Sequence, residues 1–314
     1  MTAMYSTCGE PVLLIGFNRP EFLKRVIDQV RLAAPPRVYL AIDGPRPDRE
    51  GEGQKVAQCQ QLAHSIDWDC QVHTLFQESN LGCGLGVSTA ISWFFEHEER
   101  GIILEDDLIP DPSFFPFCSE LLDRYETDNR VFAISGSSVV PRSQVDHPEN
   151  EYRFSQVPHV WGWATWRRSW DQHRLAIAPW RKRLPIRTLW RRSGRSAGGT
   201  LFWAMIFELL ARDRIDTWDG QLVYASMVSG QLTATSNENL THNIGFGEEA
   251  THTIDEHHAQ VPVGSVILPT AEIPVEVDSV AQEWTRINHF DATLMGMTKQ
   301  AMRYFRRSRR GNAR

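Results

Sequence analysis

The chain has 314 residues, enough for one or two domains and for a full hydrophobic core. Hydrophobic residues make up 41% of the chain and charged residues 23%, which disfavours disordered, collagen-like and disulfide-framework classes. No apolar run approaches the ~18 residues of a membrane span, and residues 1–10 lack the pattern of a signal peptide. We therefore expect neither a membrane-spanning nor an exported protein.

The charge is distributed unevenly. The net charge is −6, yet Arg167–Arg195 holds ten basic residues against one acid, and Lys299–Arg314 holds seven against none. A mostly acidic body with two basic patches is not typical of a nucleic-acid binder, and it favours local contact with phosphates or anionic membrane. We expect the tail Arg303–Arg314 either to contact acidic lipid at the inner membrane face or to be disordered, with disorder favoured for its last residues.

The five cysteines contain no C-x-x-C pair, which argues against a disulfide framework and a structural zinc site. We predict reduced cysteines and a cytoplasmic protein.

Short apolar runs alternate with amphipathic stretches in the first 140 residues. The apolar runs predict strands at Val12–Phe17, Arg37–Asp43, Gln71–Phe76, Gly101–Glu105 and Val131–Ser135. The amphipathic stretches predict helices at Glu21–Ala33, Gln54–Ile66, Cys83–His97 and Ser113–Tyr125. This alternation predicts an α/β fold of Rossmann-like type, with a mostly parallel sheet flanked by helices.

The regular alternation ends after Ser135. Six of the eleven tryptophans lie between Val160 and Trp190, and we expect core packing for most of those between Trp161 and Trp170. Leu201–Ala211 predicts a helix, Asn239–Thr253 a mobile loop, and Asp291–Arg314 an amphipathic helix that continues into the basic tail. We expect a nucleotide-binding half at 1–140, an acceptor and catalytic half of the same domain at 141–255, and an extension at 256–314.

Three adjacent carboxylates, Glu105, Asp106 and Asp107, follow a buried apolar strand. Ligands of open α/β sheets bind outside the carboxyl ends of the strands. Three adjacent negative charges repel one another, and a hard divalent cation such as Mg²⁺ or Mn²⁺, completed by substrate phosphates, relieves that repulsion. The alternative is a solvated turn with helix-capping carboxylates.

The neighbouring strand ends carry side chains suited to a nucleotide. Arg19 can pair with a phosphate, Asp43 can accept hydrogen bonds from a base or ribose, and Asn80 and Gly82 precede the next helix, where glycine permits close backbone approach. The glycine run beginning at Gly82 has Val87 where a dinucleotide fingerprint requires glycine, which disfavours a Rossmann dehydrogenase.

An ordered set of short motifs spans roughly residues 12–255. The motifs are Phe17-Asn18-Arg19-Pro20, Ala41-Ile42-Asp43, Asn80-Leu81-Gly82, Leu104-Glu105-Asp106-Asp107 with Asp111-x-x-Phe114-Phe115, Trp161-Gly162-Trp163, Trp218-Asp219 and Asn243-Ile244-Gly245-Phe246-Gly247 with His252. In this order and spacing, the chain resembles the GT-A type nucleotide-sugar glycosyltransferases, in particular the N-acetylglucosaminyltransferase I group and its bacterial relatives.

The resemblance implies roles for the donor-binding residues. Glu105, Asp106 and Asp107 resemble a variant of the DxD motif, with Asp107 as the metal ligand and the other two supporting the ribose and the water shell of the metal. Arg19 and Asp43 would match the phosphate and uracil contacts.

The resemblance also implies roles in the second half of the chain. Asp219 would be the catalytic carboxylate, Trp161 would lie near the donor sugar, and Asn243–His252 would match a loop that orders over the bound nucleotide-sugar, with His252 among the donor-binding residues. The basic insert at Ala176–Gly199 has no counterpart in the family.

These roles predict a metal-dependent, inverting glycosyltransferase that uses a nucleoside-diphosphate-sugar, with a UDP-sugar favoured, and a glycan or lipid-linked acceptor in bacterial surface polysaccharide assembly. A single carboxylate base opposite the leaving group gives inversion at the anomeric carbon. If Asp219 is only a helix cap, Glu208 or Glu248 is the alternative base.

Two other functions remain open at this stage. A sugar nucleotidyltransferase also uses acidic residues beside a nucleotide-binding sheet, but commonly has a glycine-rich loop after its first strand, whereas here Asn18-Arg19-Pro20 leads directly into a helix. A non-catalytic carbohydrate-binding module would use the tryptophan-rich segment and leave the carboxylates unexplained. The cluster Arg181–Arg195 is either a site for an anionic acceptor or a solvated helical face.

Overall fold

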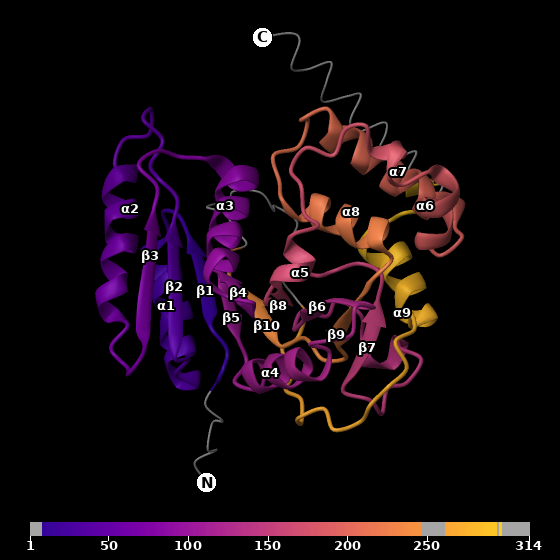
Figure 1. Ribbon diagram of the computed structural model, residues 1–314, viewed down its shortest axis with the longest axis horizontal. Helices are drawn as coiled ribbons and strands as arrows, with labels where there is room; N and C mark the ends of the chain where they lie inside the picture. Colours follow the sequence, from indigo (N-terminus) through magenta and orange to yellow (C-terminus); the bar gives the residue numbers. More distant parts are fainter. Residues whose placement is uncertain (1–7, 246–260, 294, 297–314) are drawn as a thin grey trace.

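The computed structural model describes residues 8–245, 261–293 and 295–296. These residues form an α/β fold in which an eight-stranded sheet is flanked by helices (Figure 1). Four of its seven strand pairings are parallel, so the predicted fold class is confirmed. Within the described residues, no helix is long and apolar enough to cross a bilayer. All five cysteines are free thiols, as predicted.

The bounds of the elements are as follows. The strands are β1 (Val12–Gly16), β2 (Arg37–Ile42), β3 (Gln71–Phe76), β4 (Arg100–Glu105), β5 (Leu108–Pro110), β6 (Val131–Ser135), β7 (Tyr152–Ser155), β8 (Trp163–Trp166), β9 (Leu232–Ser236) and β10 (Thr241–Asn243). The helices are α1 (Pro20–Ala33), α2 (Glu52–Gln61), α3 (Gly82–His97), α4 (Phe114–Arg124), α5 (Arg167–Trp170), α6 (Ile186–Arg192), α7 (Ala197–Ala211), α8 (Asp219–Ser229) and α9 (Ser279–Trp284). The short helical turns are η1 (Leu62–Ser65), η2 (Arg142–Gln144), η3 (Trp180–Lys182) and the π-helical η5 (Thr285–His289).

The order of the large sheet creates a switch point between β1 and β4. The strand order is β3-β2-β1-β4-β8-β6-β9-β7, so the chain first builds outward from β1 and then returns to place β4 on its other side. Both β2 and β4 pair with β1 in parallel register. The carboxyl ends of β1 and β4 therefore lie side by side, which is where open α/β sheets bind ligands.

Successive side chains of the central strands pack alternately into two separate hydrophobic cores, one on each face of the sheet. In β1, Val12 and Leu14 join the core beneath α1, α2 and α4, whereas Leu13 and Ile15 join the core that contains α3. All five residues of this strand are buried, which explains its continuous apolar sequence. Pro20 occupies the first turn of α1, where its missing N–H costs no hydrogen bond.

A third core forms between α6, α7 and α8, outside the sheet. It is built mainly from large side chains, including Trp180, Trp203, Phe207 and Tyr224. The prediction of core packing is confirmed for Trp163, Trp166 and Trp170, which are all buried.

The structure corrects several predicted boundaries. The helix predicted at Gln54–Ile66 ends at Gln61 and continues as η1. The prediction of a loop over all of Asn239–Thr253 is wrong at Thr241–Asn243, because β10 pairs there with β5, a strand that the sequence did not predict. Three-residue strands have too little periodicity to be recognised locally, and only their pairing defines them. Most of the helix predicted at Asp291–Arg314 lies outside the described residues.

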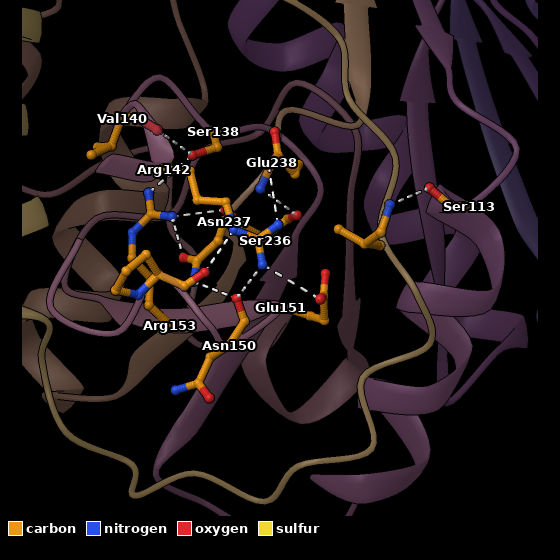
Figure 2. Close-up of polar contacts among 12 residues, drawn as sticks. Ser113, Ser138, Val140, Arg142, Asn150, Glu151, Arg153, Ser236, Asn237 and Glu238 are labelled. Atoms are coloured by element: carbon orange, nitrogen blue, oxygen red, sulfur yellow. Dashed lines mark hydrogen bonds and ion pairs between the residues drawn. The ribbon is translucent and has the colours of Figure 1, made fainter. Parts of the chain in front are cut away.

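Two arginines fix the edge of the sheet at β7 (Figure 2). Arg153 is 5% exposed, and its guanidinium donates to the carbonyl of Ser236 at 2.8 Å and to Oδ1 of Asn237 at 2.9 Å. Burial lowers the pKa of Arg153 to about 10. Arg142 donates to the carbonyl of Pro148 at 2.7 Å and pairs with Glu238 at 3.1 Å. These contacts tie the segment before β7 to the segment after β9.

The close packing of β4 against α3 gives a stability prediction. A Cβ atom on Gly101 would lie 2.3 Å from Cζ of Phe94 and 2.8 Å from the carbonyl oxygen of Pro11. We expect Gly101→Ala to lower the free energy of unfolding by ~1–3 kcal/mol in urea titrations. Gly53 in α2 has open space around its Cβ position, so the control Gly53→Ala is expected to be neutral or stabilising by ~0.5–1 kcal/mol. Equal effects of the two substitutions would contradict this account.

Candidate functional site

A cleft of about 880 Å³ opens at the carboxyl ends of β1, β2 and β4. It is lined by every predicted site residue that the structure describes: Arg19, Asp43, Asn80, Gly82, Glu105, Asp106, Asp107, Trp161 and Asp219. His252, also predicted for this site, lies outside the described residues. The tertiary structure thus gathers residues from positions 19 to 219 into one cavity.

Arg19 forms the electrostatic centre of the cleft. Its guanidinium hydrogen-bonds Oδ1 of Asp106 and lies 3.0 Å from Oδ2 of Asp107. Asp106 is 2% exposed and also accepts a hydrogen bond from the backbone N–H of Phe17 at 3.3 Å. Burial raises the pKa of Asp106 to about 6, although Arg19 opposes the shift. Arg19, from the segment after β1, therefore partly neutralises Asp106 and Asp107, which follow β4.

Glu105 and Asp107 complete the acidic part of the cleft. Burial, and then the charges of Asp107 and Asp106, raise the pKa of Glu105 to about 8. The side chain of Asp107 is 16% exposed and lines the cleft. Across the described residues, no group of three or more His, Cys, Asp or Glu side chains is arranged to hold a metal. A site with one or two protein carboxylates fits Mg²⁺ or Mn²⁺ when phosphates and water complete the shell.

Asp43 organises the turn that leads into α3. Its carboxylate accepts hydrogen bonds from the N–H groups of Gly44 and Leu81, both at 2.9 Å, and from Nδ2 of Asn80 at 2.9 Å. Gly82 has φ +79°, which explains why glycine stands there. Asp43 and Asn80 thus shape the cleft wall as one hydrogen-bonded unit, and their contact with a base or ribose remains a prediction.

Asp216 joins the two halves of the cleft, and sequence analysis did not identify it. Its carboxylate accepts hydrogen bonds from the N–H groups of Cys83 at 3.2 Å and Gly84 at 2.9 Å. These N–H groups belong to the first turn of α3, which lacks a capping side chain of its own. Because Asp216 caps α3 from a position 132 residues away, the sequence around α3 contains no capping motif that could have identified it.

Arg46 is a second residue that the sequence analysis missed. It lines the cleft, and its guanidinium lies 5.4 Å from the ring centroid of Phe17. Glu52 holds it in place through a hydrogen bond of 3.0 Å from Nε of Arg46. Hydrogen bonds from Arg46 lower the pKa of Glu52 to about 2. The only sequence signal is an acidic residue six positions after a basic one, which is too common to single out.

Asp219 begins α8 and lines the cleft, near enough to Glu105 for its charge to contribute to the raised pKa of that residue. Its Oδ1 accepts hydrogen bonds from Oγ1 of Thr217 and, at 2.7 Å, from the N–H of Gly220. The preceding Trp218 is buried and stacks on Trp163, with ring centroids 5.7 Å apart. A rigid aromatic anchor therefore fixes the backbone beside an exposed carboxylate.

The other carboxylates considered for the base occupy different places. Glu208 forms ion pairs with Arg181 at 3.0 Å and Arg212 at 2.6 Å, and it does not line the cleft. Glu248 lies outside the described residues. The thiol of Cys83 lines the cleft, but burial, followed by the charges of Glu105 and Asp219, raises its pKa to about 12. A thiol with that pKa is a poor nucleophile at neutral pH.

The short ribbon of β5 and β10 brings a distant segment onto the acidic centre. The N–H of Ile244 donates to the carbonyl of Asp107 at 2.8 Å, and Oδ1 of Asn243 accepts from the N–H of Gly245 at 2.8 Å. A Cβ atom on Gly245 would lie 2.1 Å from Oδ2 of Asp107. A side chain at this position would therefore displace the carboxylate of Asp107, because the backbone passes close to it.

The far side of the cleft is apolar. Its lining comes mainly from α7, with further side chains from α8 and from the segments before β8 and after α9. The apolar residues are Val157, Phe202, Trp203, Ile206, Leu210, Val223 and Phe290. The cleft therefore has a charged end at the sheet and an apolar end at the third core.

His173 gives a pH-dependent prediction for the Asp219 side of the cleft. It is 7% exposed, stacks on Trp170 with centroids 4.2 Å apart, and its Nε2 lies 3.1 Å from the carbonyl oxygen of Trp218. Burial lowers its pKa from 6.5 to about 4, so the unfolded chain binds the proton first as the pH falls. The neutral imidazole of the folded state therefore contributes fully to the free energy of unfolding above pH 6.5. This contribution, up to ~3 kcal/mol, is lost progressively as the pH falls toward 4.

We therefore expect His173→Gln to weaken the dependence of the unfolding free energy on pH between 6.5 and 4. The control is His147→Gln, because the His147 side chain is 72% exposed. Chemical unfolding at several pH values measures both slopes, and an unchanged slope in His173→Gln would contradict the prediction.

No protein-family model matches this chain, and no curated protein matches its sequence. Among solved structures, it is similar to three enzymes at 9–10% identity. The glycosyltransferase GlyE from Streptococcus pneumoniae TIGR4 is 10% identical with a TM-score of 0.34, and the match covers 73% of this chain and 45% of that chain. The inositol-1-phosphate CTP transferase from T. maritima is 9% identical with a TM-score of 0.36, and the match covers 84% of this chain and 100% of that chain. A UDP-glucose pyrophosphorylase complexed with UDP-glucose is 9% identical with a TM-score of 0.37, and the match covers 73% of this chain and 90% of that chain. At these scores the similarities do not assign a function.

Proposed function

We propose that the protein is a metal-dependent, inverting glycosyltransferase that uses a nucleoside-diphosphate-sugar, with a UDP-sugar favoured. The observation that carries the proposal is that one cleft is lined both by two carboxylates paired with Arg19 and by the carboxylate of Asp219. This is the arrangement that transfer from a nucleotide-sugar requires, because the leaving diphosphate needs positive charge and the acceptor hydroxyl needs a base.

The donor would lie at the charged end of the cleft. Arg19 would contact the diphosphate, Arg46 and Phe17 would border the nucleoside, and Asp107 would ligate Mn²⁺ or Mg²⁺. A bound divalent ion would supply Lewis-acid stabilisation of the diphosphate leaving group. Because Arg19 already contacts Oδ2 of Asp107, it would exchange part of that contact for the phosphate.

Asp219 would act as the base on the acceptor side. It is exposed at the first residue of α8, and its backbone is held by the buried Trp218. It would take the proton from the acceptor hydroxyl while the oxygen attacks the anomeric carbon opposite the leaving group, which inverts the configuration. Trp161 lines the cleft, where it would border the donor sugar.

The acceptor would enter from the apolar end. The aromatic and aliphatic lining contributed by α7 suits the apolar part of a lipid-linked sugar better than a wholly polar glycan. We therefore favour a glycolipid acceptor, as used in bacterial surface polysaccharide assembly.

A sugar nucleotidyltransferase is the alternative enzyme. It is less favoured because only three residues separate the end of β1 from Pro20, the first residue of α1, leaving no room for a glycine-rich phosphate loop. A non-catalytic carbohydrate-binding module would not require three adjacent acidic residues in the cleft, with Asp106 buried. The products separate the enzymes, since a glycosyltransferase releases free nucleoside diphosphate.

Nucleotide binding provides the first test of the proposal. We expect one of UDP, GDP, CDP, dTDP or ADP to raise the melting temperature by a few degrees only when Mn²⁺ is present, which corresponds to ~2.7 kcal/mol at 100 times the dissociation constant. Asp107→Ala should abolish this shift, whereas Asp171→Ala, at an exposed residue outside the cleft, should retain it. No shift with any of the five would exclude a metal-dependent nucleotide site.

The second test concerns Asp219. We expect Asp219→Asn to lower the rate of sugar transfer ~10²- to 10⁴-fold while leaving the Mn²⁺-dependent nucleotide shift intact, because only proton removal is lost. Asp171→Asn is the matched control. Release of nucleoside diphosphate from the donor, measured with glycolipid acceptors, provides the rate, and normal turnover in Asp219→Asn would assign the base to another residue.

A further inference from the structure

The segment from η3 to the start of α7 has a surface that is strongly basic. Residues 180–201 contain seven Arg or Lys side chains and no Asp or Glu. Figure 1 shows α6 and α7 together at one edge of the molecule, far from α2. The segment is held to the rest of the chain through buried side chains, including Leu184 and Leu189, so its charged residues are displayed on a folded support.

Most of these cations have no acidic partner. Arg181 pairs with Glu208, but within residues 8–245 and 261–293 no ion pair involves the other six. Lys182, Arg183, Arg187, Arg191 and Arg195 are exposed. This contrasts with the arginines near the sheet, such as Arg19 and Arg46, which are neutralised by carboxylates. Uncompensated charge of this density attracts a polyanionic surface.

Large apolar side chains lie exposed among the cations. Ile186 and Trp190 are 45% and 40% exposed, and their spacing of four residues places them on one face of α6. Leu201 on the adjoining α7 is 50% exposed. Phosphate contacts alone would not require exposed isoleucine and leucine, whereas a bilayer interface accommodates apolar side chains below the headgroups and basic side chains among them.

We propose that the surface formed by η3, α6 and the first turns of α7 binds an anionic phospholipid bilayer. Ile186 and Trp190 insert at the level of the headgroups, and Arg187 and Arg191 contact lipid phosphates. This contact is separate from the basic tail and does not depend on the proposed sugar transfer.

The proposed membrane-binding surface adjoins the apolar end of the cleft, because α7 contributes to both. Phe202, Trp203 and Ile206 of α7 line the apolar end of the cleft, while Leu201 of the same helix faces solvent. Docking through α6 and α7 would bring the apolar end of the cleft close to the membrane. A membrane-embedded substrate could then reach the cleft without leaving the bilayer completely.

Co-sedimentation of the full-length protein with vesicles tests the proposal. We expect binding to vesicles of equal parts phosphatidylglycerol and phosphatidylcholine, weakening as salt is raised, and little binding to phosphatidylcholine alone. Arg187→Glu with Arg191→Glu should weaken binding at least ~10-fold, given ~1 kcal/mol for each basic residue at the surface. Ile186→Ser with Trp190→Ser should also weaken binding while keeping its dependence on salt, because the basic side chains that contact the lipid phosphates remain.

The matched control applies the same charge reversal to another surface. Arg25→Glu with Lys55→Glu changes exposed basic residues on α1 and α2 and should leave vesicle binding nearly unchanged. An unchanged melting temperature would confirm that each variant is folded. As a second readout, brominated lipid should quench tryptophan fluorescence in the unaltered protein and do so less in Trp190→Phe.

Three results would overturn the proposal. The first is vesicle binding that survives the changes in α6 but disappears when the arginines of Arg303–Arg314 are replaced, since the tail would then be the contact. The second is equal loss of binding in the α1 and α2 control. The third is binding to a duplex oligonucleotide without binding to anionic vesicles.

Discussion

The cleft depends on the pairing of one arginine with two adjacent carboxylates. Asp106 is almost completely buried, and an unpaired charge in that position would cost several kcal/mol. Arg19 meets this requirement because β1 and β4 are parallel neighbours, so that the residues following both strands reach the same point. The same guanidinium contacts Asp107, which leaves the acidic centre partly neutralised and still open to the cleft.

The second constraint is the insertion of β8 between β4 and β6. This strand runs antiparallel to both of its neighbours, and it carries Trp163 into the core on the α3 face of the sheet. Trp163 then stacks on Trp218, which fixes the start of α8 and places Asp219 in the lining of the same cleft as the acidic residues. A packing contact between two buried indoles thus determines the position of a polar group.

The two ends of the cleft differ because different cores support them. The charged end is built on the strand ends of the sheet, where backbone groups and carboxylates already need polar partners. The apolar end is built on α7, whose inward face belongs to the third core and whose outward face carries Leu201 and Glu208. This division matches the proposed placement of a polar donor at one end and an acceptor with an apolar part at the other.

The sequence alone determined the alternating strands and helices up to Ser135, apart from β5, since their burial on one or both faces imposes a local periodicity. It also singled out Arg19, Asp43 and Asp107, because polar residues at strand ends are visible as breaks in apolar runs, whereas Asp219 was proposed only through the resemblance to a known family, and all four line the cleft. Only the tertiary structure decided the contacts of Asp216 and Gly245, and the pairing of β5 with β10. Each of these joins segments more than 120 residues apart, and interactions over that separation leave no periodic trace in either segment.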